Sequence, residues 1–117
     1  MKSVLIVDDD DLLREMFTEI LRIEGFVVSE AADSKAAMAM VHTKTFDVIT
    51  LDIALGDEDG RSLINPIRAH APKSKIFLLT GMDDNEATEA GTYVVDGVFS
   101  KAQPMEDLIA QIGGVSK

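Results

Sequence analysis

The chain has 117 residues, of which 46% are hydrophobic, with no cysteine and a formal net charge of −10. This length suits one domain with its own core, and we expect residues 1–117 to form a single domain. The lack of cysteine excludes disulfides and thiolate metal sites and suits a cytoplasmic protein. The excess of acidic residues disfavours direct nucleic-acid binding, and no apolar run approaches the roughly 20 residues that a membrane span needs.

Five short apolar segments are predicted to be strands, at residues 3–7, 26–29, 46–52, 75–80 and 98–100. Helical patterns lie between them and after the last one. We expect Asp10 or Asp11 to cap the first helix, Gly25 to end it in the left-handed conformation, and Asp33 to cap the second, which ends near Lys44. Strands that alternate with helices on short connections predict a doubly wound α/β domain with a parallel sheet.

The remaining helices are less uniform. In the third, Pro66 predicts either a kink, which we favour, or a short helix capped by Asn65 that begins at Pro66. The fourth, over residues 83–93, has weak helical propensity, and we expect it to be one of the less stable elements. The last is expected to have Pro104 at its first position and to end at the Gly113-Gly114 pair.

Polar side chains stand where the predicted strands end: Asp8, Asp9, Asp52, Thr80 and Lys101. The carboxyl ends of parallel strands share one edge of the sheet, so these groups are expected to converge. Three carboxylates at close range repel one another, and a hard divalent cation between them relieves that repulsion. Oxygen ligands alone favour Mg²⁺ or Mn²⁺ over zinc.

Each of these residues also has an ordinary structural explanation. An aspartate pair caps helices, a single aspartate or threonine ends a strand or a turn, and a lysine is usually solvated. Their coincidence in one fold favours a site. His42 and His70 fall at helix carboxyl ends, where an exposed histidine is the default, and neither is assigned a role.

Together these segments resemble the receiver domain of two-component response regulators, and the resemblance covers the whole chain. The segments are Val7-Asp8-Asp9-Asp10, Leu51-Asp52, Asp59-Gly60, Leu79-Thr80-Gly81 and Ser100-Lys101. The resemblance implies a flavodoxin-like fold, in which a five-stranded parallel sheet of order 2-1-3-4-5 is combined with five helices. It also implies a signalling switch and not a true enzyme.

The resemblance further implies that Asp52 accepts a phosphoryl group from a sensor histidine kinase or a phosphotransfer protein. Mg²⁺, or Mn²⁺, would be held by Asp9, Asp52 and the backbone carbonyl of Ala54, with Asp8 acting through water. Thr80 and Lys101 would contact phosphoryl oxygens. The output would be protein–protein contact, which we expect to involve the fourth helix; no output domain is expected after the last helix.

Three positions depart from the usual receiver pattern. Gly56 stands where proline is common, which predicts a freer loop. Ala102 follows Lys101 where a cis proline is common, and a cis bond here would cost about 3 kcal/mol. Val98 takes the place of a switch aromatic.

These departures leave a second function open, a receiver-like interaction module that does not need phosphorylation. An aspartate-nucleophile phosphatase is disfavoured, because such enzymes need a second aspartate where this chain has Ala54. A flavin-binding protein is disfavoured too, because the aspartates after the first strand would repel a phosphate.

Overall fold

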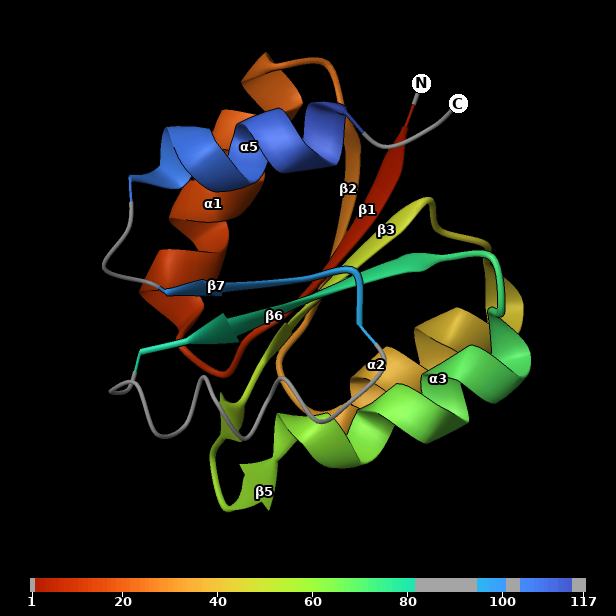
Figure 1. The fold of residues 1–117 in the computed structure, drawn as a ribbon. Coiled ribbons are helices and arrows are strands. Elements are labelled where there is room, and N and C mark those ends of the chain that lie inside the picture. The colour runs from red at the N-terminus through yellow and green to blue at the C-terminus, as the bar shows by residue number, and fades with distance from the viewer. Residues whose placement is uncertain (1, 82–94, 101–103, 115–117) are drawn as a thin grey trace.

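The structure is a computed structural model that describes residues 2–81, 95–100 and 104–114. Its centre is a five-stranded parallel sheet with the spatial order β2-β1-β3-β6-β7, shown in Figure 1. The strands are β1 (Ser3–Val7), β2 (Val27–Ala31), β3 (Val48–Asp52), β6 (Lys75–Thr80) and β7 (Gly97–Ser100). When only the five strands of this sheet are counted along the chain, β6 is the fourth and β7 the fifth, and the order is 2-1-3-4-5. This is the order that the resemblance implied, so the predicted fold class is confirmed.

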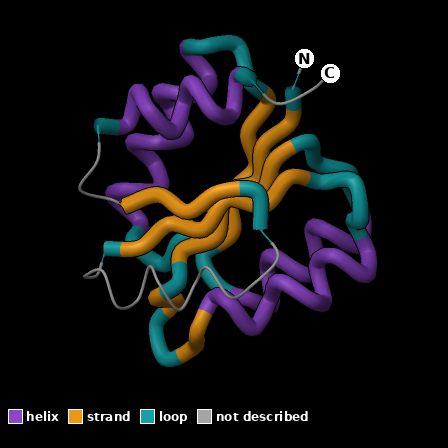
Figure 2. The backbone as a smooth tube through the Cα atoms, in the orientation of Figure 1, coloured by secondary structure: helices purple, strands orange, loops and turns teal. Residues whose placement is uncertain are grey.

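Helices cover both faces of the sheet (Figure 2). On one side lie α1 (Asp11–Ile23) and α5 (Met105–Gly113), and on the other lie α2 (Ser34–Thr43) and α3 (Ile64–His70). The fourth helix, predicted for residues 83–93, lies outside the described residues. Within the described ranges, no helix has the length and apolar character that crossing a membrane would require.

Side chains on successive strand residues alternate between two cores. Leu5, Ile49 and Leu78 belong to the core beneath α2 and α3. Ile6 and Phe77, from neighbouring positions, belong to the core beneath α1 and α5. Burial on both faces explains why the central strands are almost continuously apolar in sequence.

The predicted helix caps are present. The Asp10 carboxylate accepts a hydrogen bond from the Leu13 amide at 3.1 Å, and Asp33 accepts one from the Ala36 amide at 2.8 Å. Gly25 follows α1 with a φ of 97°, a conformation that favours glycine. These short-range signals were therefore interpreted correctly.

Two helix starts differ from the prediction. A short 3₁₀ helix, η1 (Gly60–Leu63), runs directly into α3, whose N-cap is Leu63 and not Asn65. Pro66 therefore lies in the first turn of α3, where proline is tolerated, and a kink there stays a prediction. Pro104 is the N-cap of α5 and not its first helical residue.

The segment after β3 contains two short strands where the sequence predicted a loop. It folds into a small antiparallel hairpin of β4 (Ala54–Leu55) and β5 (Glu58–Asp59). Gly56 occupies the turn with a φ of 58°, and its amide donates a hydrogen bond to Asp9 Oδ2 at 2.8 Å. Glycine permits this turn, and the greater freedom of the loop stays a prediction.

Candidate functional site

Three carboxylates converge at the carboxyl edge of the sheet. Asp8 and Asp9 follow β1, and Asp52 is the last residue of the neighbouring strand β3. Oxygen atoms of the three side chains lie within 4.8 Å of one another. Asp8 and Asp52 are each 2% exposed, whereas Asp9 is exposed. The predicted convergence of these three carboxylates is confirmed, although Asp52 is more than 40 positions from Asp8 and Asp9 in the chain.

Backbone amides orient each carboxylate. Asp8 Oδ1 accepts from the Asp10 amide at 2.9 Å, and Asp52 Oδ1 accepts from the Ala54 amide at 3.2 Å. Asp9 is held by the Gly56 amide described above. The cluster is thus built into the backbone of two loops, which restricts the directions in which its oxygens can point.

Arg14 lies beside the cluster, but its guanidinium is directed elsewhere. It bonds Asp11 at 2.7 Å, Glu30 at 3.1 Å and the backbone carbonyl of Asp8 at 2.7 Å. Burial by itself would lower the pKa of Arg14, but the hydrogen bonds to Asp11 and Glu30 outweigh it and raise that pKa. Through its hydrogen bond to the Asp8 carbonyl, Arg14 stabilises the loop after β1.

Thr80 ends β6 on the same edge of the sheet and is 2% exposed. Asp52 pairs in register with Leu79, so Thr80 lies one position further along the neighbouring strand. Thr80 pairs in turn with Ser100 at the end of β7. Lys101 and its bond to Ala102 lie outside the described residues, so the reach of Lys101 stays a prediction.

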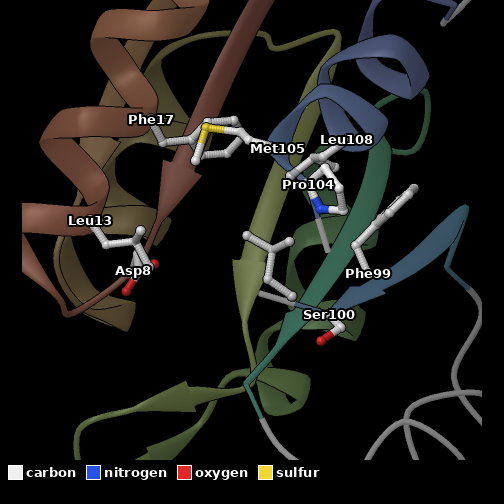
Figure 3. Close-up of a pocket in the computed structure, with 9 residues that line it drawn as sticks. Asp8, Leu13, Phe17, Phe99, Ser100, Pro104, Met105 and Leu108 are labelled. Atoms are coloured by element: carbon white, nitrogen blue, oxygen red, sulfur yellow. The ribbon is translucent and has the colours of Figure 1, made fainter. Parts of the chain in front are cut away.

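A small apolar hollow adjoins Asp8 on the side of α1 and α5 (Figure 3). Its lining comes from α1, β6, β7 and α5, namely Leu13, Phe17, Leu79, Phe99, Ser100, Pro104, Met105 and Leu108, together with Asp8. Phe99 packs edge-on against Phe77 on this side of the sheet, with 5.6 Å between the ring centroids. Val98 packs on the opposite side, against the core beneath α2 and α3. Apolar walls lower the local dielectric constant, so charges at the cluster interact more strongly than in water.

A family model for the response regulator receiver domain matches residues 4–113, which is nearly the whole chain. The chain belongs to the receiver domain family. Its relatives include a probable transcriptional regulatory protein, TcrX, of Mycobacterium tuberculosis, with 32% identity over 111 residues. That match covers 94% of this chain and 47% of TcrX, so the chain spans less than half the length of this relative.

Solved receiver structures have the same fold. A response regulator from Burkholderia pseudomallei, crystallised with a phosphorylated aspartic acid and a calcium ion, is 27% identical with a TM-score of 0.87; the match covers 96% of this chain and 66% of that one. The response regulator TrrA from Thermotoga maritima, in complex with Mg²⁺ and BeF, is 25% identical with a TM-score of 0.87; the match covers 99% of this chain and all of the other.

The donor set of this receiver domain fits a hard cation. The three clustered side chains offer only carboxylate oxygens, the ligands that Mg²⁺, Mn²⁺ and Ca²⁺ prefer. A span of 4.8 Å is one that a single ion can bridge directly or through its bound waters. The chemistry of the cluster is therefore that of a divalent cation site next to a buried aspartate.

Sequence patterns missed two features of the site. The hydrogen bond from Gly56 to Asp9 joins residues 47 positions apart, and no local signal marks it. The hairpin after β3 could have been anticipated, because Gly56-Asp57 between two short segments is a two-residue turn signal.

Proposed function

We propose that this receiver domain is a phosphorylation-dependent switch in a two-component phosphorelay, with Asp52 as the phosphoacceptor. The observation that supports this most strongly is the position of Asp52. Its side chain is buried at the end of β3, and its carboxylate oxygen lies within 4.8 Å of carboxylate oxygens of Asp8 and Asp9. Membership of the receiver family supports a histidine kinase or a phosphotransfer protein as the donor. We propose that the domain extends over residues 1–117 and acts in the cytoplasm.

In the reaction, a carboxylate oxygen of Asp52 attacks the phosphorus of a phosphohistidine. A P–O bond to Asp52 forms as the P–N bond breaks, and the imidazole leaves with the electron pair and takes up a proton. The products are an aspartyl phosphate and a neutral histidine, and atoms and charge balance when the imidazole takes its proton from solvent. The receiver promotes only its own phosphorylation and dephosphorylation and is otherwise not an enzyme.

Asp9, Asp52 and the backbone carbonyl of Ala54 would hold Mg²⁺, or alternatively Mn²⁺, with Asp8 acting through water. When bound, the cation would neutralise charge that develops on the transferring phosphoryl oxygens. Asp8 and Asp9 are positioned for this by the amides of Asp10 and Gly56, so the ligands are oriented before the phosphoryl group arrives.

Thr80 and Lys101 would contact two of the phosphoryl oxygens once Asp52 is modified. An aspartyl phosphate carries close to two negative charges, about one more than the carboxylate that it replaces, and these charges attract a hydroxyl donor and an ammonium group. That attraction would shift the chain after β6 and β7 and change the surface offered to a downstream protein. We propose output by protein contact, with no direct binding of nucleic acid by this domain.

The test is incubation of the purified chain with Mg²⁺ and acetyl phosphate, followed by intact-mass and peptide mass spectrometry. One added phosphoryl group is expected at Asp52, dependent on Mg²⁺ and absent from Asp52→Asn. Asp57→Asn is the matched control, since Asp57 is an exposed aspartate of the adjacent hairpin turn and should leave the modification intact. Absence of any Mg²⁺-dependent modification would instead support an interaction module that needs no phosphate.

A further inference from the structure

The two histidines of the chain meet at the end of the molecule opposite the carboxylate cluster. His42 is in the last turn of α2, and His70 is the last residue of α3. Their ring centroids are 4.0 Å apart with an interplanar angle of 44°. Both residues are exposed, and they are 28 positions apart in sequence, so the packing of α2 beside α3 creates the pair.

The pair borders a hollow at the amino ends of the strands. This hollow is also lined by Asp47 and by three lysines, Lys44, Lys73 and Lys75. Over the described residues, neither imidazole takes part in a hydrogen bond or an ion pair, and the two rings contact each other. The ring nitrogens are therefore available to a ligand that enters from solvent.

We propose that His42 and His70 form a two-ligand binding site for a borderline divalent cation such as Zn²⁺, Ni²⁺ or Cu²⁺. Imidazole nitrogen is a preferred ligand of these ions and a poor one for Mg²⁺. Zinc–nitrogen bonds of about 2.0–2.1 Å at a tetrahedral angle place the centroids of two imidazole rings about 5 Å apart. The rings are 4.0 Å apart in the structure. Side-chain rotation of the two exposed histidines therefore has to move the rings about 1 Å further apart. The negative carboxyl end of α2 also favours a cation here.

Solvent or an anion would complete the coordination. Among the described residues, no third side chain of a ligand type joins His42 and His70 in a metal-binding cluster. The histidine pair therefore supplies two of the ligands that the cation needs. The lysines that share the hollow repel a bare cation but attract an anionic co-ligand. We therefore expect moderate affinity, below that of a closed four-ligand site.

The two ends of the molecule would then select different metals. The carboxylate cluster offers hard oxygen ligands, and the histidine pair offers borderline nitrogen ligands. A cation at the histidine pair would also link α2 to α3 and bind only the folded chain. At 100 times its dissociation constant, it would raise the ratio of folded to unfolded protein about 100-fold.

The experiment is a calorimetric titration of the full chain with Zn²⁺ in saturating Mg²⁺, which occupies the carboxylate cluster. One equivalent of Zn²⁺ is expected to bind, and affinity should fall at least tenfold in His42→Gln and in His70→Gln. Asp9→Asn, which alters the other site, is the matched control and should bind Zn²⁺ as the wild type does.

Unfolding by urea without metal would establish that the histidine variants are folded, which is expected because both side chains are exposed. With Zn²⁺, a rise in the unfolding midpoint is expected for the wild type and not for either variant. The absence of saturable Zn²⁺ binding, unchanged binding in both histidine variants, or loss of binding in Asp9→Asn would each overturn the proposal.

Discussion

Gly60 lies directly against the backbone that carries the proposed acceptor. A Cβ atom at this position would stand 1.9 Å from the Asp52 carbonyl oxygen and 2.9 Å from the Asp52 carbonyl carbon. The Gly60 amide also donates to the Ile53 carbonyl at 2.7 Å. The Asp59-Gly60 signature in the sequence therefore has a steric reason, since only glycine lets the chain pass this close to the end of β3.

We predict that Gly60→Ala destabilises the protein by about 1–3 kcal/mol and impairs modification of Asp52, because the backbone at Asp52 has to move. Urea unfolding and the acetyl phosphate assay measure the two effects. The matched control is Gly113→Ala, where a Cβ would meet only the Phe26 ring at 4.0 Å and should be neutral or stabilising. Equal stability of the two variants would contradict this explanation of Gly60.

At the scale of single elements, hydrogen bonds fix the hairpin β4–β5 and the helix η1, which follow β3 beside the carboxylate cluster. The Ser34 hydroxyl at the start of α2 donates to Glu58 at 2.7 Å, and Asp59 caps η1 by accepting from the Arg61 amide at 2.9 Å. Arg61 Nε also donates to both Asp59 oxygens. These hydrogen bonds from Arg61 lower the pKa of Asp59 below 3.8, against a smaller opposing effect of burial.

This predicts a pH dependence for the contribution of Arg61. A lowered pKa in the folded state means that the Asp59–Arg61 pair adds stability above pH 3.8 and loses it as the pH falls through the folded-state pKa. The difference in unfolding free energy between wild type and Arg61→Gln should therefore shrink on acidification, as urea titrations on both sides of pH 3.8 would measure.

Arg22→Gln is the control for that series, because Arg22 donates to the backbone carbonyl of Val28 and not to a carboxylate. Its effect should change little with pH. If the effect of Arg61→Gln were equally independent of pH, the assignment of the Asp59 pKa shift to Arg61 would be wrong.

At the scale of the whole molecule, the charge is unevenly placed. Asp8, Asp9 and Asp52 gather at the carboxyl edge of the sheet in a chain with a net charge of −10, whereas three lysines line the hollow at the amino edge. Folding therefore brings carboxylates into mutual repulsion at one end. A cation bound there offsets that cost and links metal binding to global stability.

We predict that Mg²⁺ raises the melting temperature of the wild type. At a free concentration 100 times the dissociation constant, the stabilisation is about 2.7 kcal/mol, or roughly 10 °C for a chain of this size. Asp9→Asn should melt slightly higher without Mg²⁺, because one repelling charge is gone, and should gain much less from Mg²⁺. Thermal unfolding followed by circular dichroism would test this, and an equal gain in both proteins would count against the proposed site.

Local sequence signals were sufficient for much of the architecture. Alternating apolar segments, the caps at Asp10 and Asp33, and the strand over residues 75–80 are determined by neighbours a few positions away, so the order of elements followed from sequence alone. Polar residues at strand ends also indicated where a site would form. The start of α3 could not be located in this way, because a 3₁₀ turn precedes it and places Pro66 in the first turn and not at its first position.

Sequence by itself thus determined the fold class, the family and the acidic residues of the candidate site. Tertiary structure alone decided the distances: the 4.8 Å cluster of carboxylates, the bond from Gly56 to Asp9, and the pairing of His42 with His70. The physical reason is that local propensities act over a few residues. The separation of groups tens of positions apart depends instead on sheet register, on how helices pack and on the path of each turn.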